Sequence, residues 1–294
     1  MTVSAFQELT CPLDGDPLEH VNSLWRCAAG HSFDIAREGY IHLLPVQKKR
    51  SRDPGDSKAM IAARRRFLNS GSYHPIAAAV NQSALARLSD NASLNCLDAG
   101  CGEGYYLREL AAAVHPEHSL AVLGLDISKW AVISAAKQQQ EPCWVVGSNA
   151  NLPVQSSSLD LILCMFGFPV YAEFARVLKP DGELLQVDAG PNHLRELREI
   201  IYPALKPDRP VDINSPPGFN TLSIDTVSYS LQLSGAEQIA DLLMMTPHLY
   251  RASSEGRARA LLLTEIMVSV DVRLSRFGRT CIDESALSSK NGGF

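Results

Sequence analysis

The chain has 294 residues, of which 46% are hydrophobic and 20% charged, and its formal net charge is −5 at pH 7. This composition is typical of a globular protein with a substantial core and argues against a disordered chain. No apolar run is long enough to cross a bilayer and the polar N-terminus does not resemble a signal peptide, so we expect a cytoplasmic protein without a membrane partner. The seven cysteines are irregularly spaced, which argues against a disulfide framework.

Positive charge is concentrated in one segment. Between Arg37 and Arg66, nine Lys and Arg residues accompany three acidic residues, which gives this segment a charge of +6 and leaves −11 for the remainder. A basic segment on an otherwise acidic protein indicates a polyanionic partner, and we expect RNA. A solvated loop and helix is the alternative. The residues expected to contact phosphate groups are Lys48, Lys49, Arg50, Arg52, Arg64, Arg65 and Arg66.

Residues 1–45 contain most of a zinc-binding pattern. After a terminus that we expect to be loose, Cys11 and Asp14 are followed by Cys27 and His31. Zinc ribbons carry two pairs of ligands on turns, and here Asp14 stands where a second thiolate is expected. Oxygen is a poorer match than sulfur for a closed structural site, so we expect a weakened zinc site. The alternative is two unconnected cysteines and a surface histidine.

Residues 46–74 read as a basic linker and helix. The polar run from 46 to 57 is a loop, and Ser57 is suited to cap a helix that continues to Asn69 and stops before Gly71. The three consecutive arginines from Arg64 to Arg66 fan around that helix, so they cannot all face the core. A second helix is expected over 76–88.

A glycine-rich turn follows the next strand. The apolar run 94–97 ends at Asp98, after which glycines alternate at Gly100, Gly102 and Gly104, and the pattern then becomes helical. A strand, glycine turn and helix begin a doubly wound α/β sheet, and glycines there let a ligand approach the backbone closely. Asp98 is expected either to order the turn or to meet a cofactor's amino group, and capping of the helix is an equal alternative.

A second carboxylate supports a nucleotide-type cofactor. The strand 120–125 is followed by Asp126, where an acid is placed to accept hydrogen bonds from a ribose. Together with the spacing G-x-G-x-G, this resembles the first motif of class I S-adenosylmethionine methyltransferases. Further strands (143–146, 159–164, 183–187, 224–233 and 265–274) alternate with helices, so we expect a parallel sheet covered on both faces, with the reversed edge strand of methyltransferase sheets.

The ordered set of motifs resembles a known family. Cys11, Cys27-x-x-x-His31, Glu38-Gly39-Tyr40, the run 49–57, the glycine turn and Gly190-Pro191-x-His193 are similar to bacterial 23S rRNA (guanine-N1-)-methyltransferases of the RlmA type, which include tylosin-resistance methyltransferases. The resemblance covers about residues 11–277. It implies a zinc-ribbon-like RNA-recognition module (1–45), a basic linker and helix (46–74) and a class I methyltransferase domain (75–279). Residues 280–294 are expected to be a disordered tail.

The resemblance also implies site residues. Contacts to S-adenosylmethionine fall on Tyr73, Gly102, Glu103 and His193, and zinc ligands fall on Cys11, Cys27 and His31 with Asp14 in place of a cysteine. The implied reaction is methyl transfer to guanine N1 in a hairpin of 23S rRNA. The sequence identifies no catalytic residue. Phe166 or Phe168 could stack on a flipped base, and an ordinary exposed or core aromatic residue is the equal alternative. A small-molecule methyltransferase of the quinone type and a catalytically silent RNA-binding relative are the alternatives, and a homodimer would suit a bulky RNA.

Overall fold

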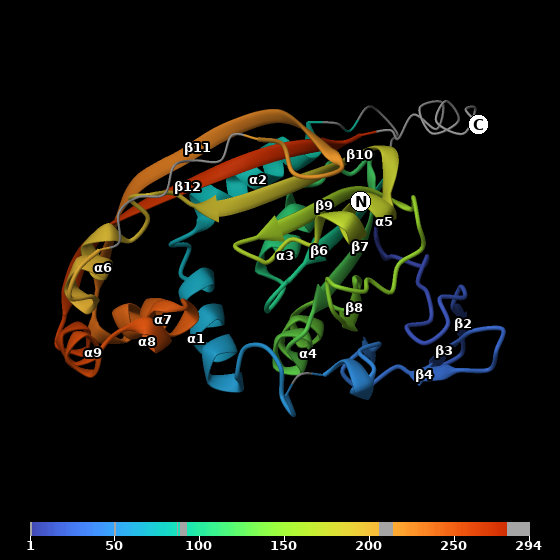
Figure 1. The fold of residues 1–294 in the computed structure, drawn as a ribbon, viewed down its shortest axis with the longest axis horizontal. Helices are drawn as coiled ribbons and strands as arrows, with labels where there is room; N and C mark the ends of the chain where they lie inside the picture. The colour runs from blue at the N-terminus through green and yellow to red at the C-terminus, as the bar shows by residue number, and fades with distance from the viewer. Residues whose placement is uncertain (1, 50, 87, 89–92, 206–213, 281–294) are drawn as a thin grey trace, which may run out of the picture.

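The computed structural model describes the chain except for residues 1, 50, 87, 89–92, 206–213 and 281–294 (Figure 1). Arg50 and the expected tail after Thr280 lie outside the described residues. No helix among the described residues is long and apolar enough to span a membrane.

A nine-stranded sheet forms the centre of the fold, in the order β11-β12-β10-β9-β6-β7-β8-β5, with β1 also paired to β7. Strands β6 to β10 run parallel, whereas β12 is antiparallel to both β10 and β11. This confirms the class I methyltransferase topology; the reversed strand is β12, and β11 lies outside it at the edge. The central strands are β6 (Ser93–Ala99), β7 (Ser119–Asp126), β8 (Cys143–Val146), β9 (Leu159–Met165), β10 (Leu178–Ala189), β11 (Phe219–Ser234) and β12 (Glu265–Arg279).

The N-terminal segment is joined to this sheet. Residues Thr2–Ala5 form β1, which runs parallel to the first half of β7, so the expectation of a loose terminus is wrong. Strand β5 (Tyr40–His42) extends the sheet beyond β8. Between them, β2 (Glu19–Val21), β3 (Leu24–Arg26) and β4 (Ser32–Asp34) make a separate three-stranded sheet at the right of Figure 1.

Two hydrophobic cores lie on opposite faces of the sheet because side chains alternate along each strand. On β6, Cys96 belongs to the core that includes α1 to α4 and α7, and its neighbour Leu97 belongs to the core that includes α5 and the N-terminal segment. The helices are α1 (Lys58–Asn69), α2 (His74–Leu85), α3 (Tyr105–Ala113), α4 (Lys129–Gln138), α5 (Tyr171–Val177), α6 (Arg195–Ile201), α7 (Ala236–Met245), α8 (His248–Arg251) and α9 (Ser254–Leu261), with a 3-10 turn at Val46–Lys48.

Helix α1 begins where the sequence predicts. The Ser57 hydroxyl accepts a hydrogen bond from the Met60 N–H at 3.3 Å, which satisfies one free donor of the first turn. The other end of α1 packs against α7, and helices α6 to α9 gather beyond the sheet at the left of Figure 1. Helix α1 therefore lies between this helical group and the glycine turn.

Close packing around Gly124 holds β7 and β8 at their spacing. Gly124 pairs with Asp98 on one side and with Trp144 on the other. A Cβ atom at this position would lie 2.2 Å from Cζ3 of the fully buried Trp144. Gly278 on β12 offers a contrast, since its Cβ would meet Leu222 at an ordinary 3.5 Å.

We therefore expect Gly124→Ala to lower the free energy of unfolding by about 1–3 kcal/mol, the usual effect of overpacking a filled core. Gly278→Ala is the matched control and should leave stability nearly unchanged. Denaturant unfolding followed by circular dichroism measures both. Equal stability of the two variants would show that Trp144 can move aside.

Candidate cofactor pocket and metal cluster

The glycine turn after β6 is held by a carboxylate from the next strand. Gly102 and Gly104 have φ angles of 55° and 84°, which favour glycine. The carboxylate of Asp126 accepts a hydrogen bond from the Gly102 N–H at 2.9 Å and from the Ser128 N–H at 2.8 Å. Asp126 thus ties the turn after β6 to the start of α4, and burial raises its pKa.

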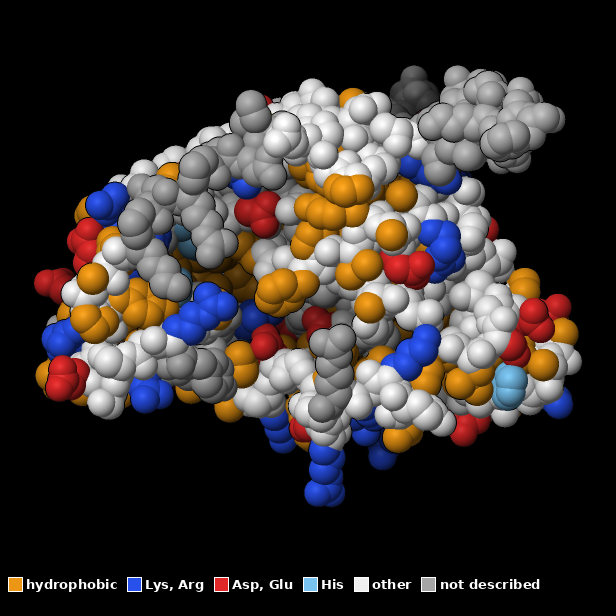
Figure 2. All heavy atoms as spheres, viewed as in Figure 1, with side chains coloured by type: hydrophobic (Ala, Val, Ile, Leu, Met, Phe, Trp, Pro, Cys, Tyr) orange, Lys and Arg blue, Asp and Glu red, His pale blue; other side chains and the backbone are white. Residues whose placement is uncertain are grey.

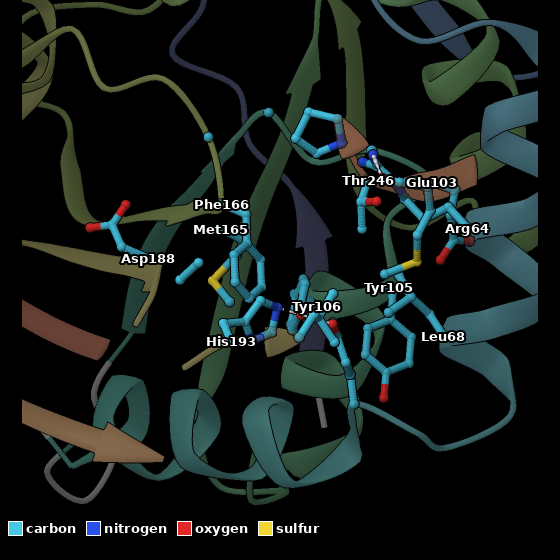
Figure 3. Close-up of a pocket in the computed structure, with 18 of the residues that line it drawn as sticks. Arg64, Leu68, Glu103, Tyr105, Tyr106, Met165, Phe166, Asp188, His193 and Thr246 are labelled. Carbon is cyan, nitrogen blue, oxygen red and sulfur yellow. Dashed lines mark hydrogen bonds between the residues drawn. The ribbon is translucent and has the colours of Figure 1, made fainter. Parts of the chain in front are cut away.

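A cavity of about 420 Å³ opens beside this turn, at the carboxyl ends of β6, β9 and β10. Figure 3 shows its side chains converging from several elements, with Glu103 and Arg64 at one end and Phe166, Asp188 and His193 at the other. Ligands of open α/β sheets bind at this edge. The residues that line it include Arg64, Tyr73, Gly102, Phe166, Asp188 and His193.

Asp98 is the penultimate residue of β6, just before the turn, and is completely buried. Neither of its carboxylate oxygens has a hydrogen-bond partner among the described residues. Burial, reinforced by nearby Asp126, raises its pKa to about 8. A buried carboxyl group without partners is costly, and a cationic ligand beside the turn would relieve that cost. S-adenosylmethionine, with its ammonium and sulfonium groups, fits this requirement.

Tyr73, His193 and Phe166 form an aromatic cluster in the wall of the cavity. The hydroxyl of Tyr73 lies 3.2 Å from Nε2 of His193, and Nδ1 of His193 accepts a hydrogen bond from the Asp271 N–H. His193 therefore carries its proton on Nε2 and donates it to Tyr73, which leaves the Tyr73 proton for another acceptor. Burial lowers the pKa of His193 to about 4, so its ring is neutral. The ring of Phe166 stacks on His193 with centroids 5.8 Å apart.

Glu103 lines the cavity, but its carboxylate is already engaged by other side chains of the protein. Its carboxylate is buried and accepts two hydrogen bonds from Arg108 at 2.9 and 3.0 Å and one from Gln138 at 2.6 Å. These partners fix the start of α3 against α4. The role of Glu103 in cofactor binding stays a prediction.

The linker before α1 packs across the same turn. The hydroxyl of Ser128 donates to the Asp56 carbonyl at 2.6 Å, and the indole N–H of Trp130 donates to the Asp53 carboxylate. Arg64 forms an ion pair with Asp56 at 2.7 Å and donates to the Met245 carbonyl. Arg64 thus joins the linker to α7 and lines the cofactor cavity, so we no longer expect it to bind RNA phosphate.

Among the other expected RNA residues that the structure describes, Lys49 is half-buried, and the remainder divide into two groups. Arg66 forms two hydrogen bonds with the buried carboxylate of Asp241 on α7. Its charge is therefore also paired within the protein. In contrast, Lys48, Arg52 and Arg65 are exposed, and their side chains make no hydrogen bond or ion pair within the described part of the chain. Figure 2 shows Lys and Arg side chains extending from the lower edge of the molecule, where Figure 1 draws α1 and α4.

Sequence reasoning overlooked Asp188 and the turn after α7. Asp188 comes one residue after the expected end of its strand, and the rule that ligands bind at the carboxyl ends of parallel strands would have indicated it. Thr246 and His248, which also line the cavity, follow a helix with no motif of its own. Only the packing of α7 against α1 brings them there.

The four expected metal ligands converge on the N-terminal turns, away from the cofactor cavity. The ligand atoms of Cys11, Asp14, Cys27 and His31 all lie within 4.8 Å of one another. Nδ1 of His31 is 3.6 Å from the Cys11 sulfur and 3.5 Å from the Cys27 sulfur, and Asp14 Oδ2 is 3.3 Å from the Cys27 sulfur. A tetrahedral zinc ion places sulfur about 3.5–3.6 Å from a neighbouring nitrogen or oxygen ligand. The cluster is compatible with zinc, with Asp14 as fourth ligand.

If Asp14 is a ligand, its loss should make zinc easier to remove. We expect protein purified without chelator to contain zinc and Asp14→Ala to lose it to a chelator much faster than wild type. Asp16→Ala is the matched control, because it removes an acid from the same turn and keeps the backbone N–H that donates to Asp14. Metal analysis after timed dialysis against chelator measures this; equal retention in Asp14→Ala would exclude Asp14 as a ligand.

Two family models match the chain: "RlmA, N-terminal", a zinc ribbon, over residues 9–52, and "Methyltransferase domain" over residues 96–182. A Micromonospora griseorubida protein named for 23S rRNA (guanine-N(1)-)-methyltransferase activity is 33% identical over 92% of this chain and 96% of its own length. The 23S rRNA (guanine(748)-N(1))-methyltransferase of Streptomyces fradiae is 32% identical over 68% of this chain and 70% of its own length. The chain therefore belongs to the family of 23S rRNA (guanine-N1-)-methyltransferases of the RlmA type.

Proposed function

We propose that this protein transfers a methyl group from S-adenosylmethionine to N1 of a guanine in a 23S rRNA hairpin. The observation that carries this proposal is the buried carboxyl group of Asp98 beside the left-handed glycine turn, in a protein of this family. Within the described residues this carboxyl group has no hydrogen-bond partner. A methyltransferase that acts on a small molecule would not need the metal cluster or the exposed basic residues. We further propose the cytoplasm as the compartment and a homodimer as the assembly.

Different residues of the chain would hold different parts of the cofactor. S-adenosylmethionine, when bound, supplies an electrophilic methyl group on a sulfonium. Asp98 offers a negative charge to the cationic part of that cofactor, and the backbone of Gly100 and Gly102 allows close approach. Asp126 orders the turn and has further lone pairs for a ribose. Tyr73 and His193 close the wall opposite the turn, where Tyr73 has a hydroxyl proton to donate. The alignment of reacting groups in a dry cavity is the main contribution expected of such a site.

Binding of the cationic cofactor should release a proton from Asp98. In the free protein its pKa of about 8 keeps the carboxyl group mostly protonated at pH 7, and a nearby cation favours the ionised form. Calorimetric titration in two buffers of different ionisation enthalpy counts the protons released. We expect release in wild type, and both lower affinity and no release in Asp98→Asn. Identical titrations would place the cofactor elsewhere.

The raised pKa of Asp98 also makes the stability of the cofactor-free protein depend on pH. The pKa of Asp98 is raised on folding from 3.8 to about 8, so the folded state binds the proton more tightly. Its contribution to stability is therefore present at low pH and is lost as pH rises through this window. Asp98→Asn should flatten that part of the stability curve, measured by thermal unfolding without cofactor.

Contact with RNA is assigned to the exposed basic residues near α1. Lys48, Arg52 and Arg65 are exposed on the segment that carries the excess positive charge. Phosphate contacts from such residues give sequence-independent affinity that salt weakens. Phe168, whose side chain is 87% exposed, follows Phe166 at the carboxyl end of β9 and offers a ring for stacking on an unpaired base.

Reversal of two of these charges should weaken RNA binding and leave cofactor binding intact. We expect Arg52→Glu/Arg65→Glu to reduce affinity for a 23S rRNA fragment and to lower the slope of log K against log salt by about one per lost phosphate contact. Arg257→Glu, on exposed α9, is the control for a reversed charge outside the basic segment. Filter binding over a salt series measures affinity, and primer extension across the fragment detects methylation at guanine N1. Absence of RNA methylation by a wild-type protein that binds the cofactor would overturn the proposed function.

A further inference from the structure

A second cavity of about 250 Å³ adjoins the cofactor cavity at the carboxyl end of β10. Asp188 lines both cavities and therefore stands where they meet. In Figure 3 its carboxylate is directed away from Met165 and Phe166. The second cavity is lined by polar side chains that include Tyr171, Gln186, Asp188 and Arg273.

An acid and an arginine lie side by side in the wall of this second cavity. Asp188 on β10 and Arg273 on β12 are direct partners in the antiparallel register, so their side chains leave the sheet on the same face. Yet they form no ion pair within 4.0 Å among the described residues, and the buried Nε of Arg273 has no hydrogen-bond partner there. A buried arginine nitrogen without a partner indicates a place where a ligand completes the hydrogen bonding.

A chain of hydrogen bonds orients the acid. The hydroxyl of Tyr171 donates to Oε1 of Gln186 at 3.2 Å, and Nε2 of Gln186 donates to Oδ2 of Asp188 at 2.8 Å. Gln186 and Asp188 are two residues apart on β10 and share one face. Within the described residues only Oδ2 of Asp188 is engaged, so Oδ1 is left to accept from a ligand.

We propose that the second cavity is the pocket for the target guanine, in which Asp188 takes the N1 proton and Arg273 recognises the base. This inference rests on the proposed function. Guanine presents N1–H and an amino group as donors along one edge and O6 and N7 as acceptors. Asp188 accepts from the donor edge, and Arg273 donates to O6, the side-chain type most often used for this base. Gln186 and Tyr171 are positioning residues for Asp188.

The assignment supplies the base that guanine N1 requires. At neutral pH this nitrogen carries a proton, so its lone pair must be released before it can attack. The N1–H bond breaks with the proton going to Oδ1 of Asp188 and the electron pair staying on N1. That pair forms the bond to the methyl carbon as the carbon–sulfur bond breaks and leaves its electrons on sulfur. Because Asp188 lines both cavities, one carboxyl group can serve a base in the second cavity next to a cofactor in the first.

Asp188→Asn tests the proposal because it keeps the size of the side chain and removes its ability to take a proton. We expect single-turnover methylation of the 23S rRNA fragment to fall about 10²–10⁴-fold, the usual contribution of a general base, with calorimetric affinity for S-adenosylmethionine unchanged. Glu255→Gln, which neutralises an exposed acid on α9, is the control and should retain the wild-type rate.

The pH profile separates a base from a merely structural residue. The Asp188→Asn rate should rise steadily as pH approaches the pKa of guanine N1, because solvent then removes the proton, and the gap from wild type should narrow. Tyr171→Phe, which removes only the anchoring hydroxyl, should lower the rate less and keep the wild-type form of the profile. Arg273→Gln should weaken discrimination of the target guanine from an adenine placed at the same position.

Two results would overturn the inference. One is an Asp188→Asn protein that methylates RNA at the wild-type rate; the other is a protein whose loss of activity comes with loss of cofactor affinity and is not relieved at high pH. Both are read against a wild-type enzyme that is active on the same RNA. A wild type that binds the cofactor and leaves the RNA unmethylated would instead refute the proposed function.

Discussion

Two hydrogen bonds to the carboxylate of Asp126 join the parts of this molecule that must meet at the cofactor. One comes from the Gly102 N–H in the turn after β6, and the other comes from the Ser128 N–H at the start of α4. The hydroxyl of Ser128 in turn binds the Asp56 carbonyl in the linker before α1. A short polar network thus aligns the turn and the linker along one edge of the sheet. Because these groups are largely removed from water, the loss of one partner would leave the others unsatisfied, which is more costly than the bond itself is worth.

The basic helix α1 serves the interior of the protein as well as its surface. Arg64 and Arg66 connect α1 to the linker and to α7 through Asp56 and Asp241. They therefore hold one wall of the cofactor cavity in place, and Arg65 between them is exposed, as the proposed contact with RNA requires. Contact between RNA and this segment would be close to the wall of the cavity, whereas the metal cluster lies with the N-terminal strands on the other flank of the sheet (Figure 1).

The carboxyl-end edge of the sheet keeps several features that a fold without a ligand would avoid. Among the described residues, neither oxygen of the buried Asp98 carboxyl group has a hydrogen-bond partner, and the buried Nε of Arg273 has none either. Phe166 and Leu194, which line the cavity from the segments after β9 and β10, have positive φ angles of 52° and 53°. Such features cost free energy and persist where the surrounding structure enforces them, commonly at functional sites. Their concentration at one edge of the sheet agrees with a site that becomes satisfied only when both reactants are bound.

The sequence by itself determined the features that depend on neighbouring residues: the glycine turn, the carboxylates at the ends of β6 and β7, the cap at Ser57 and the metal-binding turns. Strand and helix periodicity and turn chemistry are local, so they can be read in order along the chain. The tertiary structure alone decided that Arg66 binds Asp241, 175 residues away, that β1 joins the sheet, and that Asp188 faces Arg273. In each case the partner comes from a distant segment, and the choice between solvent and a buried partner depends on how helices and strands pack, which no local pattern encodes.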